Sequence, residues 1–269
     1  MRIKEGSVCL VTGASSGIGK AIADTLAAEG MRVYGTSRNP VTIPSTPVTM
    51  LPLTLSDQAS IEAAVAEIIA REGQIDCLIN NAGSGICGAI EETSLEKIRE
   101  QLNCCFLGHV AVTKAVLPLM RKQGGGRIVN TGFVAGFVPI PFQTWYSASK
   151  AAVQSYTMAM GNELRPFGIT LTAVLPGDTK TGFTAARQKI DDPDGLYGGR
   201  IERSVMRMEQ DEQNGVPAQK VGELIAKVAL KKRVKPLYIP GFSYNLINVL
   251  MRILPSGLAN RLIGVLYAK

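Results

Sequence analysis

A tyrosine and a lysine one helical turn apart are the residues of this chain best suited to move a proton. Tyr146 and Lys150 lie four positions apart, so in a helix their side chains share one face. A phenol has a pKa of about 10 in water, and an ammonium group close by favours the phenolate and lowers that pKa. The pair is therefore predicted to act as an acid/base group on an alcohol or carbonyl oxygen. The same spacing also occurs on helices without any function, so the pair needs support from the rest of the chain.

A glycine-rich stretch near the N-terminus predicts a nucleotide site. The apolar run Ser7–Val11 predicts a buried strand, and a helical pattern through Ile22 and Leu26 follows the stretch Thr12–Gly19. Its spacing is G-x-x-x-G-x-G. Glycines let the backbone approach a ligand closely, and the helix N-terminus offers free N–H groups to a pyrophosphate. The strand before and the helix after favour this interpretation over an ordinary glycine-rich loop.

The second predicted strand, residues 32–36, ends at Ser37 and Arg38. In dinucleotide-binding folds an acidic residue at this place binds the adenosine ribose 2′-hydroxyl, whereas an arginine accommodates a 2′-phosphate. Because Arg38 is present and no acid is, NADP(H) is the expected cofactor. The alternative is a surface arginine that binds no ligand.

Strands and helices alternate along most of the chain, with short connections between them. Further strands are predicted at residues 48–53, 75–79, 127–130, 168–175 and 236–240, and helices at 57–72, 94–120, 146–165 and 217–231. This pattern indicates right-handed βαβ units, so we expect an α/β fold with a doubly wound parallel sheet in a single domain, residues 1–269. Ligands bind at the carboxyl ends of such strands, which places the predicted site residues along one edge of the sheet.

The composition excludes several functional classes. Hydrophobic residues make up 46% of the chain and the formal net charge is +7, but the basic residues form no dense run, so nucleic acid is not an expected partner. A single histidine, His109, and five scattered cysteines, Cys9, Cys77, Cys87, Cys104 and Cys105, predict reduced intracellular thiols and no metal site. The stretch Met1–Gly6 has no apolar signal core, and no run of apolar residues is long enough to predict a spanning helix, so a cytoplasmic location is expected.

With these positions placed, the chain resembles the short-chain dehydrogenase/reductase family from its N-terminus to about Gly241. The family implies a Rossmann fold and hydride transfer between a nicotinamide and an alcohol or carbonyl group. The motifs that carry the resemblance are T-G-x-x-x-G-x-G at Thr12–Gly19, N-N-A-G at Asn80–Gly83, Asn103 in a helix, Y-x-x-x-K at Tyr146–Lys150 and P-G at Pro176–Gly177.

The resemblance assigns a role to each matching residue. Tyr146 is expected to be the acid/base, Lys150 to lower its pKa and hold the nicotinamide ribose, and Asn103 to position a water in a proton relay. The residues expected to bind the cofactor are Gly13, Ser15, Ser16, Gly17, Ile18, Gly19, Ser37, Arg38, Asn80, Ala82, Gly83, Tyr146, Lys150, Pro176, Gly177, Thr179 and Thr181.

The chain departs from the family pattern at two places. Thr54 stands in the third-strand stretch where the family often has an acid near the adenine. More seriously, Phe133 lies thirteen residues before Tyr146, where the family has its catalytic serine. We therefore expect an NADPH-dependent carbonyl reductase or alcohol dehydrogenase weakened by Phe133. The alternatives are an impaired variant, natural or engineered, and a non-catalytic, NADP(H)-binding regulatory member of the family.

The expected substrate is a small hydrophobic carbonyl compound or alcohol. Mostly apolar side chains are predicted to line its pocket, and they leave a steroid, a retinoid and an acyl chain open. These side chains are Ile86, Phe133, Val134, Phe137, Ile140, Phe142 and Phe183. Residues 178–214 are polar and less periodic, and are predicted to form an insertion that acts as a substrate lid.

Residues 242–269 are predicted to form an apolar helical extension in two pieces. Leu246, Leu250 and Ile253 form one stripe, and Leu258, Leu262 and Val265 form another, with Pro255–Gly257 between them. Each piece is too short to cross a bilayer. The pieces are expected to pack, within the chain or in a homodimer or homotetramer, or to cover the substrate pocket. Attachment to a membrane surface is the third interpretation, because Arg252, Arg261 and Lys269 are basic.

Overall fold

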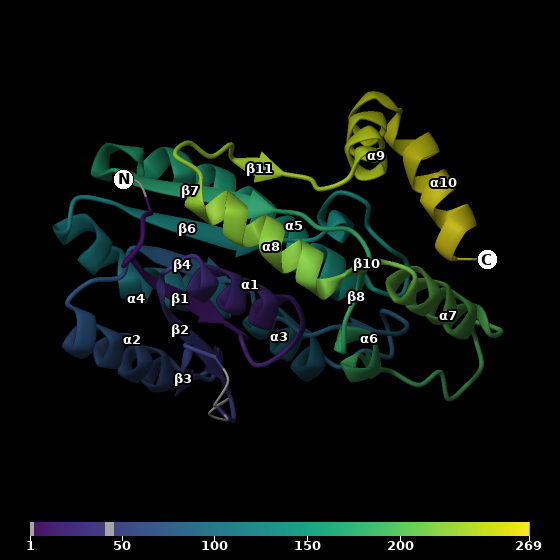
Figure 1. Cartoon of the computed structure of the whole chain (residues 1–269). Coiled ribbons are helices and arrows are strands. Elements are labelled where there is room, and N and C mark those ends of the chain that lie inside the picture. The colour runs from purple at the N-terminus through teal and green to yellow at the C-terminus, as the bar shows by residue number, and fades with distance from the viewer. Residues whose placement is uncertain (1–2, 41–45, 269) are drawn as a thin grey trace.

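The computed structural model describes residues 3–40 and 46–268 and confirms the α/β fold with its doubly wound parallel sheet. Seven strands form the main sheet in the order β11-β7-β6-β4-β1-β2-β3, and every neighbouring pair is parallel. Helices cover both faces of the sheet (Figure 1). The strands of this sheet are β1 (Val8–Thr12), β2 (Arg32–Ser37), β3 (Thr49–Pro52), β4 (Cys77–Asn80), β6 (Gly126–Thr131), β7 (Ile169–Val174) and β11 (Leu237–Tyr238).

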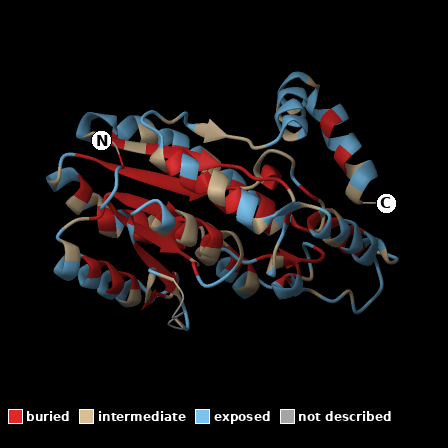
Figure 2. Cartoon of the chain, in the orientation of Figure 1, coloured by how far each residue is buried: buried red, intermediate tan, exposed pale blue. Residues whose placement is uncertain are grey.

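The core lies in two layers, one on each face of the sheet, and the buried strands between them stand out in Figure 2. On one face α1 and α8 pack against each other and the sheet, and on the other face α2, α4 and the end of α5 do so. These helices are α1 (Gly17–Ala28), α2 (Gln58–Glu72), α4 (Gly108–Lys122), α5 (Thr144–Glu163) and α8 (Ala218–Leu230).

Local sequence signals fix the ends of the predicted helices. The side chain of Asp57 accepts hydrogen bonds from the backbone N–H groups of Ala59 and Ser60 and so caps α2. Gly73 ends that helix with a φ of 70°, a left-handed conformation that favours glycine. Ser94 caps α3 (Leu95–Leu102) by accepting from the N–H of Lys97.

One long helix passes through α3, the π-helical turn η1 (Asn103–Leu107) and α4. Among the described helices, Leu95–Lys122 alone is long and apolar enough to cross a membrane by length and composition, and 33% of its most apolar window is buried. Val112, Val116 and Met120 of this helix are fully buried against the sheet. A core helix of an α/β domain has the same apolar composition, and the packing assigns Leu95–Lys122 to that class.

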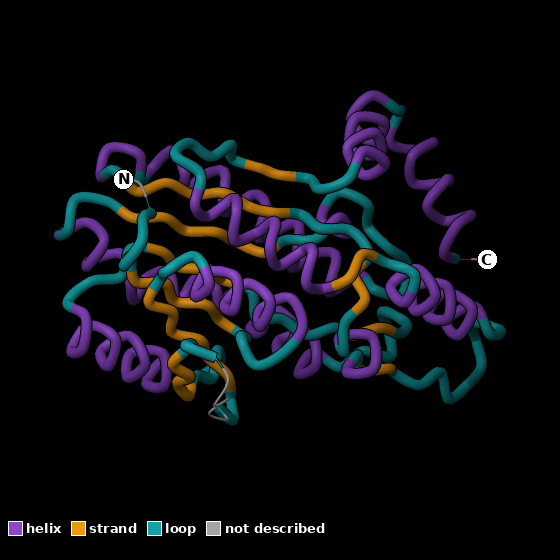
Figure 3. The backbone as a smooth tube through the Cα atoms, in the orientation of Figure 1, coloured by secondary structure: helices purple, strands orange, loops and turns teal. Residues whose placement is uncertain are grey.

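The insertion, residues 178–214, lies beyond the carboxyl ends of the sheet strands and combines short elements with loops (Figure 3). Its longest helix, α7, was missed because charged residues mask a buried stripe of Ile201, Val205 and Met208 at helical spacing. Two small parallel pairs frame the insertion, β8 with β10 and β5 with β9. The elements are β5 (Ile86–Cys87), β8 (Thr179–Lys180), α6 (Phe183–Ala186), β9 (Gln188–Lys189), α7 (Arg200–Gln213) and β10 (Val216–Pro217).

The C-terminal extension forms α9 (Phe242–Ile253) and α10 (Ser256–Tyr267), with the predicted break at Pro255. Both helices project beside the sheet (Figure 1). Ala259 and Ile263 of α10 are buried, and α10 packs against α7, whereas α9 buries no residue. Both predicted apolar stripes stay exposed in the single chain, with side chains 43% to 73% accessible, so the packing expected of them is not found within one chain. Lys269 lies outside the described residues.

Candidate active site

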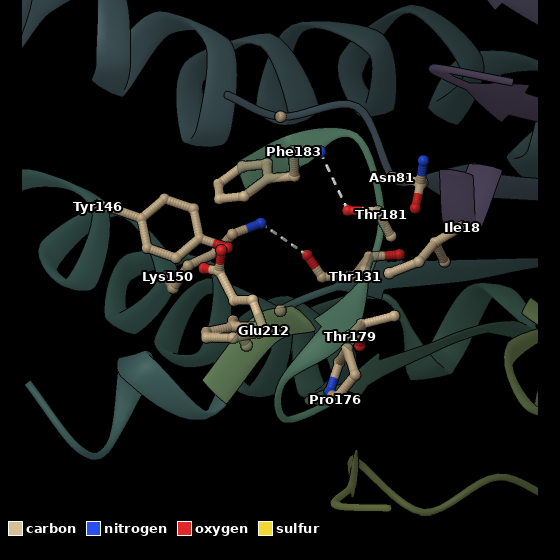
Figure 4. A pocket seen from close by; sticks show the side chains of 13 residues that line it. Ile18, Asn81, Thr131, Tyr146, Lys150, Pro176, Thr179, Thr181, Phe183 and Glu212 are labelled. Carbon is tan, nitrogen blue, oxygen red and sulfur yellow. Dashed lines mark hydrogen bonds between the residues drawn. The ribbon is translucent and has the colours of Figure 1, made fainter. Parts of the chain in front are cut away.

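A pocket at the carboxyl ends of the sheet strands brings the acid/base pair together with residues from distant parts of the chain (Figure 4). Of its lining residues, nine were predicted: Ile18, Gly83, Phe133, Tyr146, Lys150, Pro176, Thr179, Thr181 and Phe183. Four others line it as well: Asn81, Thr131, Gly132 and Glu212. The structure therefore brings these nine predicted residues together at one edge of the sheet, and the other predicted site residues do not line the described pocket.

Tyr146 and Lys150 lie on one face of α5, and both are buried. The Lys150 Nζ lies 5.5 Å from the centre of the Tyr146 ring and donates a hydrogen bond of 3.1 Å to the carbonyl oxygen of Thr131. Burial raises the pKa of Tyr146 well above its usual value, and burial lowers the pKa of Lys150. The net direction of the Tyr146 pKa is therefore opposite to the lowering expected from Lys150, because the loss of solvent dominates.

Two phenylalanine rings form the apolar wall around the tyrosine. The centre of the Phe133 ring lies 5.7 Å from that of Tyr146 at an interplanar angle of 66°, and the Phe183 ring lies at 5.4 Å. Such edge-to-face contacts are favourable and fix ring orientation. The hydroxyl of Thr131 is buried and has no described hydrogen-bond partner. Position 133 therefore presents a ring to Tyr146 and no hydrogen-bond donor.

The glycine loop is packed so tightly that side chains are excluded. A Cβ on Gly13 would lie 2.8 Å from the Cα of Ala82, and one on Gly19 would lie 2.0 Å from the carbonyl oxygen of Gly13. The Thr12 hydroxyl accepts hydrogen bonds from the N–H groups of Asn81 and Ala82, at 3.0 and 3.1 Å, and so ties the two predicted motifs together. The loop and the N-N-A-G stretch thus form one surface next to the N-terminus of α1.

The end of β2 has the polar groups that a cofactor phosphate requires. The Ser37 hydroxyl is buried without a described hydrogen-bond partner, and Arg38 is exposed and forms no ion pair with any described residue. A hydroxyl donor and a guanidinium that pairs with no described carboxylate are compatible with a 2′-phosphate. The residues present therefore fit a phosphorylated dinucleotide.

Several residues predicted to bind cofactor or substrate lie outside the described pocket. Asn80 donates to Thr113 and Asn130 and so joins β4, α4 and β6 from within the core. Asn103 begins the π-helical turn, and no described contact joins its side chain to Lys150. Val134, Ile140 and Phe142, predicted to contact substrate, do not line the described pocket. Ile140 and Phe142 belong to the hydrophobic cluster around Tyr146, and Val134 is buried in the short turn after β6.

The sequence did not predict a place in the site for three residues near Tyr146 and Lys150. Glu212 lines the pocket from α7, which was expected to be irregular. Cys105 is buried near Lys150: the Cys104 thiol and Lys150 lower its pKa, to about 6, against the effect of burial. His109 bonds the carbonyl oxygen of Ala82 at 2.7 Å, and burial lowers its pKa to about 3, so it stays neutral. Of the three residues, His109 alone could have been suspected from the sequence, because it lies on the helix that follows the N-N-A-G motif.

The parallel sheet, the glycine loop and the buried Tyr–Lys pair define a dinucleotide-binding oxidoreductase. Residues 7–192 match the short chain dehydrogenase family model, and the chain belongs to that family. It is 42% identical over 227 residues to the 3-ketodihydrosphingosine reductase of Bacteroides thetaiotaomicron, which covers 84% of each protein. It is 29% identical over 253 residues to the probable short-chain type dehydrogenase/reductase VdlC of Helicobacter pylori, with 93% of each covered.

Solved structures agree with this assignment. A short-chain dehydrogenase from Streptomyces avermitilis superposes with a TM-score of 0.82 at 28% identity, covering 98% of this chain and 97% of that one. A short-chain dehydrogenase/reductase from Burkholderia phymatum, solved in complex with NAD, gives a TM-score of 0.81 at 23% identity with 94% of each covered. The second likeness shows the fold alone.

Proposed function

We propose that this protein is an NADPH-dependent reductase of hydrophobic ketones, with long-chain ketones of the 3-ketodihydrosphingosine type as its substrate class. The observation that carries the proposal is the burial of Tyr146 and Lys150 in a pocket walled by the rings of Phe133 and Phe183. An apolar wall with few polar groups suits an alkyl ketone, and the phenol provides the proton that the carbonyl oxygen needs.

The glycine loop and Lys150 would hold the nicotinamide cofactor, which would supply the hydride that the carbonyl carbon accepts. Tyr146 donates its proton to the carbonyl oxygen, which yields the alcohol and leaves a phenolate. Lys150 lies close enough to stabilise that phenolate by its charge, while Thr131 fixes the ammonium group. Asn103 is proposed to hold a water through which the tyrosine regains its proton from solvent. Because burial raises the pKa of Tyr146, the protonated form needed for reduction predominates at neutral pH.

The choice of cofactor and substrate rests on two further observations. Arg38 and the Ser37 hydroxyl, neither with a partner among the described residues, support NADPH over NADH. The 42% identity to a 3-ketodihydrosphingosine reductase supports a long-chain ketone. A steroid ketone has rigid rings and a retinal has a polyene, and the comparison favours neither.

A second candidate function is cofactor binding without turnover, and Phe133 favours it. The ring at this position offers no donor to a developing oxyanion, and loss of one such donor costs about a hundred- to a thousand-fold in rate. The retained Tyr146 and Lys150 argue for the reductase.

Steady-state oxidation of NADPH separates the two functions. The purified chain is assayed with 3-ketodihydrosphingosine, a steroid ketone and a retinal, with the Tyr146→Phe variant as a matched control. The reductase predicts turnover of the long-chain ketone that disappears in the control. NADPH binding, seen by its fluorescence, without reduction of any of the three substrates would instead establish the non-catalytic alternative.

A further inference from the structure

The active-site pocket contains a buried carboxylate that the proton transfer does not use. Glu212 comes from α7 in the insertion, is 7% exposed and lines the same pocket as Tyr146 and Lys150. Figure 4 shows its side chain beside the tyrosine. Water is largely excluded from this carboxylate, and burying such a group is costly unless it is paired or has a ligand.

The carboxylate is held from behind by two residues of the same insertion. The Thr184 hydroxyl donates a hydrogen bond of 2.6 Å to Oε2, and the Arg187 guanidinium pairs with Oε1. Arg187 also lies over the Phe183 ring, with its Cζ 5.6 Å from the ring centre. An ionised carboxylate offers about four lone-pair sites, so each Glu212 oxygen can accept one more hydrogen bond.

Two charged side chains line the described pocket, Lys150 and Glu212. Lys150, the cation, donates a hydrogen bond to the carbonyl oxygen of Thr131. Glu212 is the only carboxylate among the described lining residues. A cationic group of a ligand in this pocket would therefore find its charge partner in Glu212.

We infer that Glu212 binds a protonated amine that the substrate carries beside its ketone, and that Thr184 and Arg187 position this carboxylate. The inference rests on the proposed ketone reductase function and deepens it. Since Glu212 and Tyr146 line one pocket, an ammonium group one carbon from the carbonyl would contact the first while the carbonyl oxygen meets the second. A 2-amino-3-ketone with a long alkyl chain has this arrangement, with the chain lying on the phenylalanine wall.

A purely structural ion pair is the competing explanation, and the chain offers a matched pair to test it. Lys189 and Glu209 form an ion pair of 2.7 Å between the same two parts of the insertion as Arg187 and Glu212. This second pair is at the surface, where the Lys189 side chain is 57% exposed. The substitutions Glu212→Gln and Glu209→Gln therefore remove one carboxylate each from one helix, in the pocket and outside it.

The experiment compares 3-ketodihydrosphingosine with its N-acetyl derivative, which keeps the ketone and the chain but has no cationic amine. We expect Glu212→Gln to raise KM for the free amine about ten- to hundred-fold more than for the N-acetyl compound, the loss typical of a charge-assisted hydrogen bond. Glu209→Gln should leave the ratio of the two KM values unchanged. Equal losses with both substrates, accompanied by a lower Tm, would assign Glu212 a structural role and overturn the inference.

A measurement on the unsubstituted protein covers the case in which Glu212→Gln does not fold. Dodecylamine and dodecanol have the same chain and differ in charge, and their binding to the NADPH complex is followed by cofactor fluorescence. The inference requires tighter binding of the amine, and equal affinities refute it. This readout needs no turnover, so a protein that binds the amine but reduces no ketone would refute the proposed function and leave the amine site standing.

Discussion

Replacing Phe133 with serine should raise kcat/KM for a long-chain ketone at least ten-fold and leave NADPH affinity nearly unchanged. The ring of Phe133 lies 5.7 Å from that of Tyr146, so a shorter side chain there opens space beside the phenol and places a hydroxyl in it. One donor to a developing oxyanion is typically worth about a hundred- to a thousand-fold in rate. We expect only part of this gain, because the aromatic contact that orients Tyr146 is lost at the same time, at a cost of about 0.5–1.5 kcal/mol.

The assay is steady-state NADPH oxidation, with Phe133→Ala as the control that removes the ring without adding a hydroxyl. Phe133 packs against the hydrophobic cluster around Tyr146, so both variants should lower Tm, and rates are compared where both are folded. A gain in Phe133→Ser alone identifies the hydroxyl as its source. If the serine variant is no faster than the unsubstituted protein on any ketone, the phenylalanine is a working part of the pocket, and the reasoning about a missing donor is wrong.

Three further predictions follow from groups at the edge of the site and at its surface. Arg38→Ala should weaken NADPH binding at least ten-fold more than NADH binding. The guanidinium at the end of β2 pairs with no described residue, so the 2′-phosphate of NADPH would be its partner. Equal losses for the two cofactors would remove the basis for NADPH. Since burial raises the pKa of Tyr146 and reduction uses its protonated form, kcat should show no loss attributable to this group up to about pH 9, a unit below the unperturbed pKa of about 10. A phenolate absorbance that titrates near neutrality in the unsubstituted protein and is missing from Tyr146→Phe would contradict the direction of this shift. Ile253 on α9 and Leu266 on α10 are 73% and 63% exposed, and replacing both by serine should leave Tm unchanged. The double variant should show less flotation with anionic vesicles or a lower mass by light scattering. A protein that neither floats nor self-associates before substitution would show that this apolar face has no partner.

The part of the site that follows from short-range patterns could be predicted from the sequence. Strand alternation with helices dictated the parallel sheet, and Tyr146 and Lys150 share a face because their spacing matches one helical turn. The strand ends then had to bring Ile18, Gly83 and Pro176 together, which the pocket confirms.

The rest depended on packing between segments with no periodic signal. Glu212 reaches the pocket because α7 packs on the cluster around Tyr146, and Arg187 and Thr184 hold its carboxylate there; none of these contacts follows from local sequence. The direction of the Tyr146 pKa shift was missed for a similar reason: it is set by how completely Phe133 and Phe183 exclude solvent, which a spacing of four residues does not reveal.

The pairing of β8 with β10 has a consequence for how this protein can acquire new substrates. Thr179 lies opposite Val216, and Lys180 lies opposite Pro217, so the two ends of the insertion meet in a two-stranded pair outside the main sheet. Everything between these points can be exchanged for a segment of another length without moving the sheet, since doubling the length of a closed loop costs only about 0.6 kcal/mol. Glu212 lies inside the exchangeable segment, whereas Tyr146 and Lys150 lie outside it. Recognition can therefore change while Tyr146 and Lys150 stay in place, and a graft of residues 184–215 from a relative should transfer substrate preference while the recipient keeps its own cofactor.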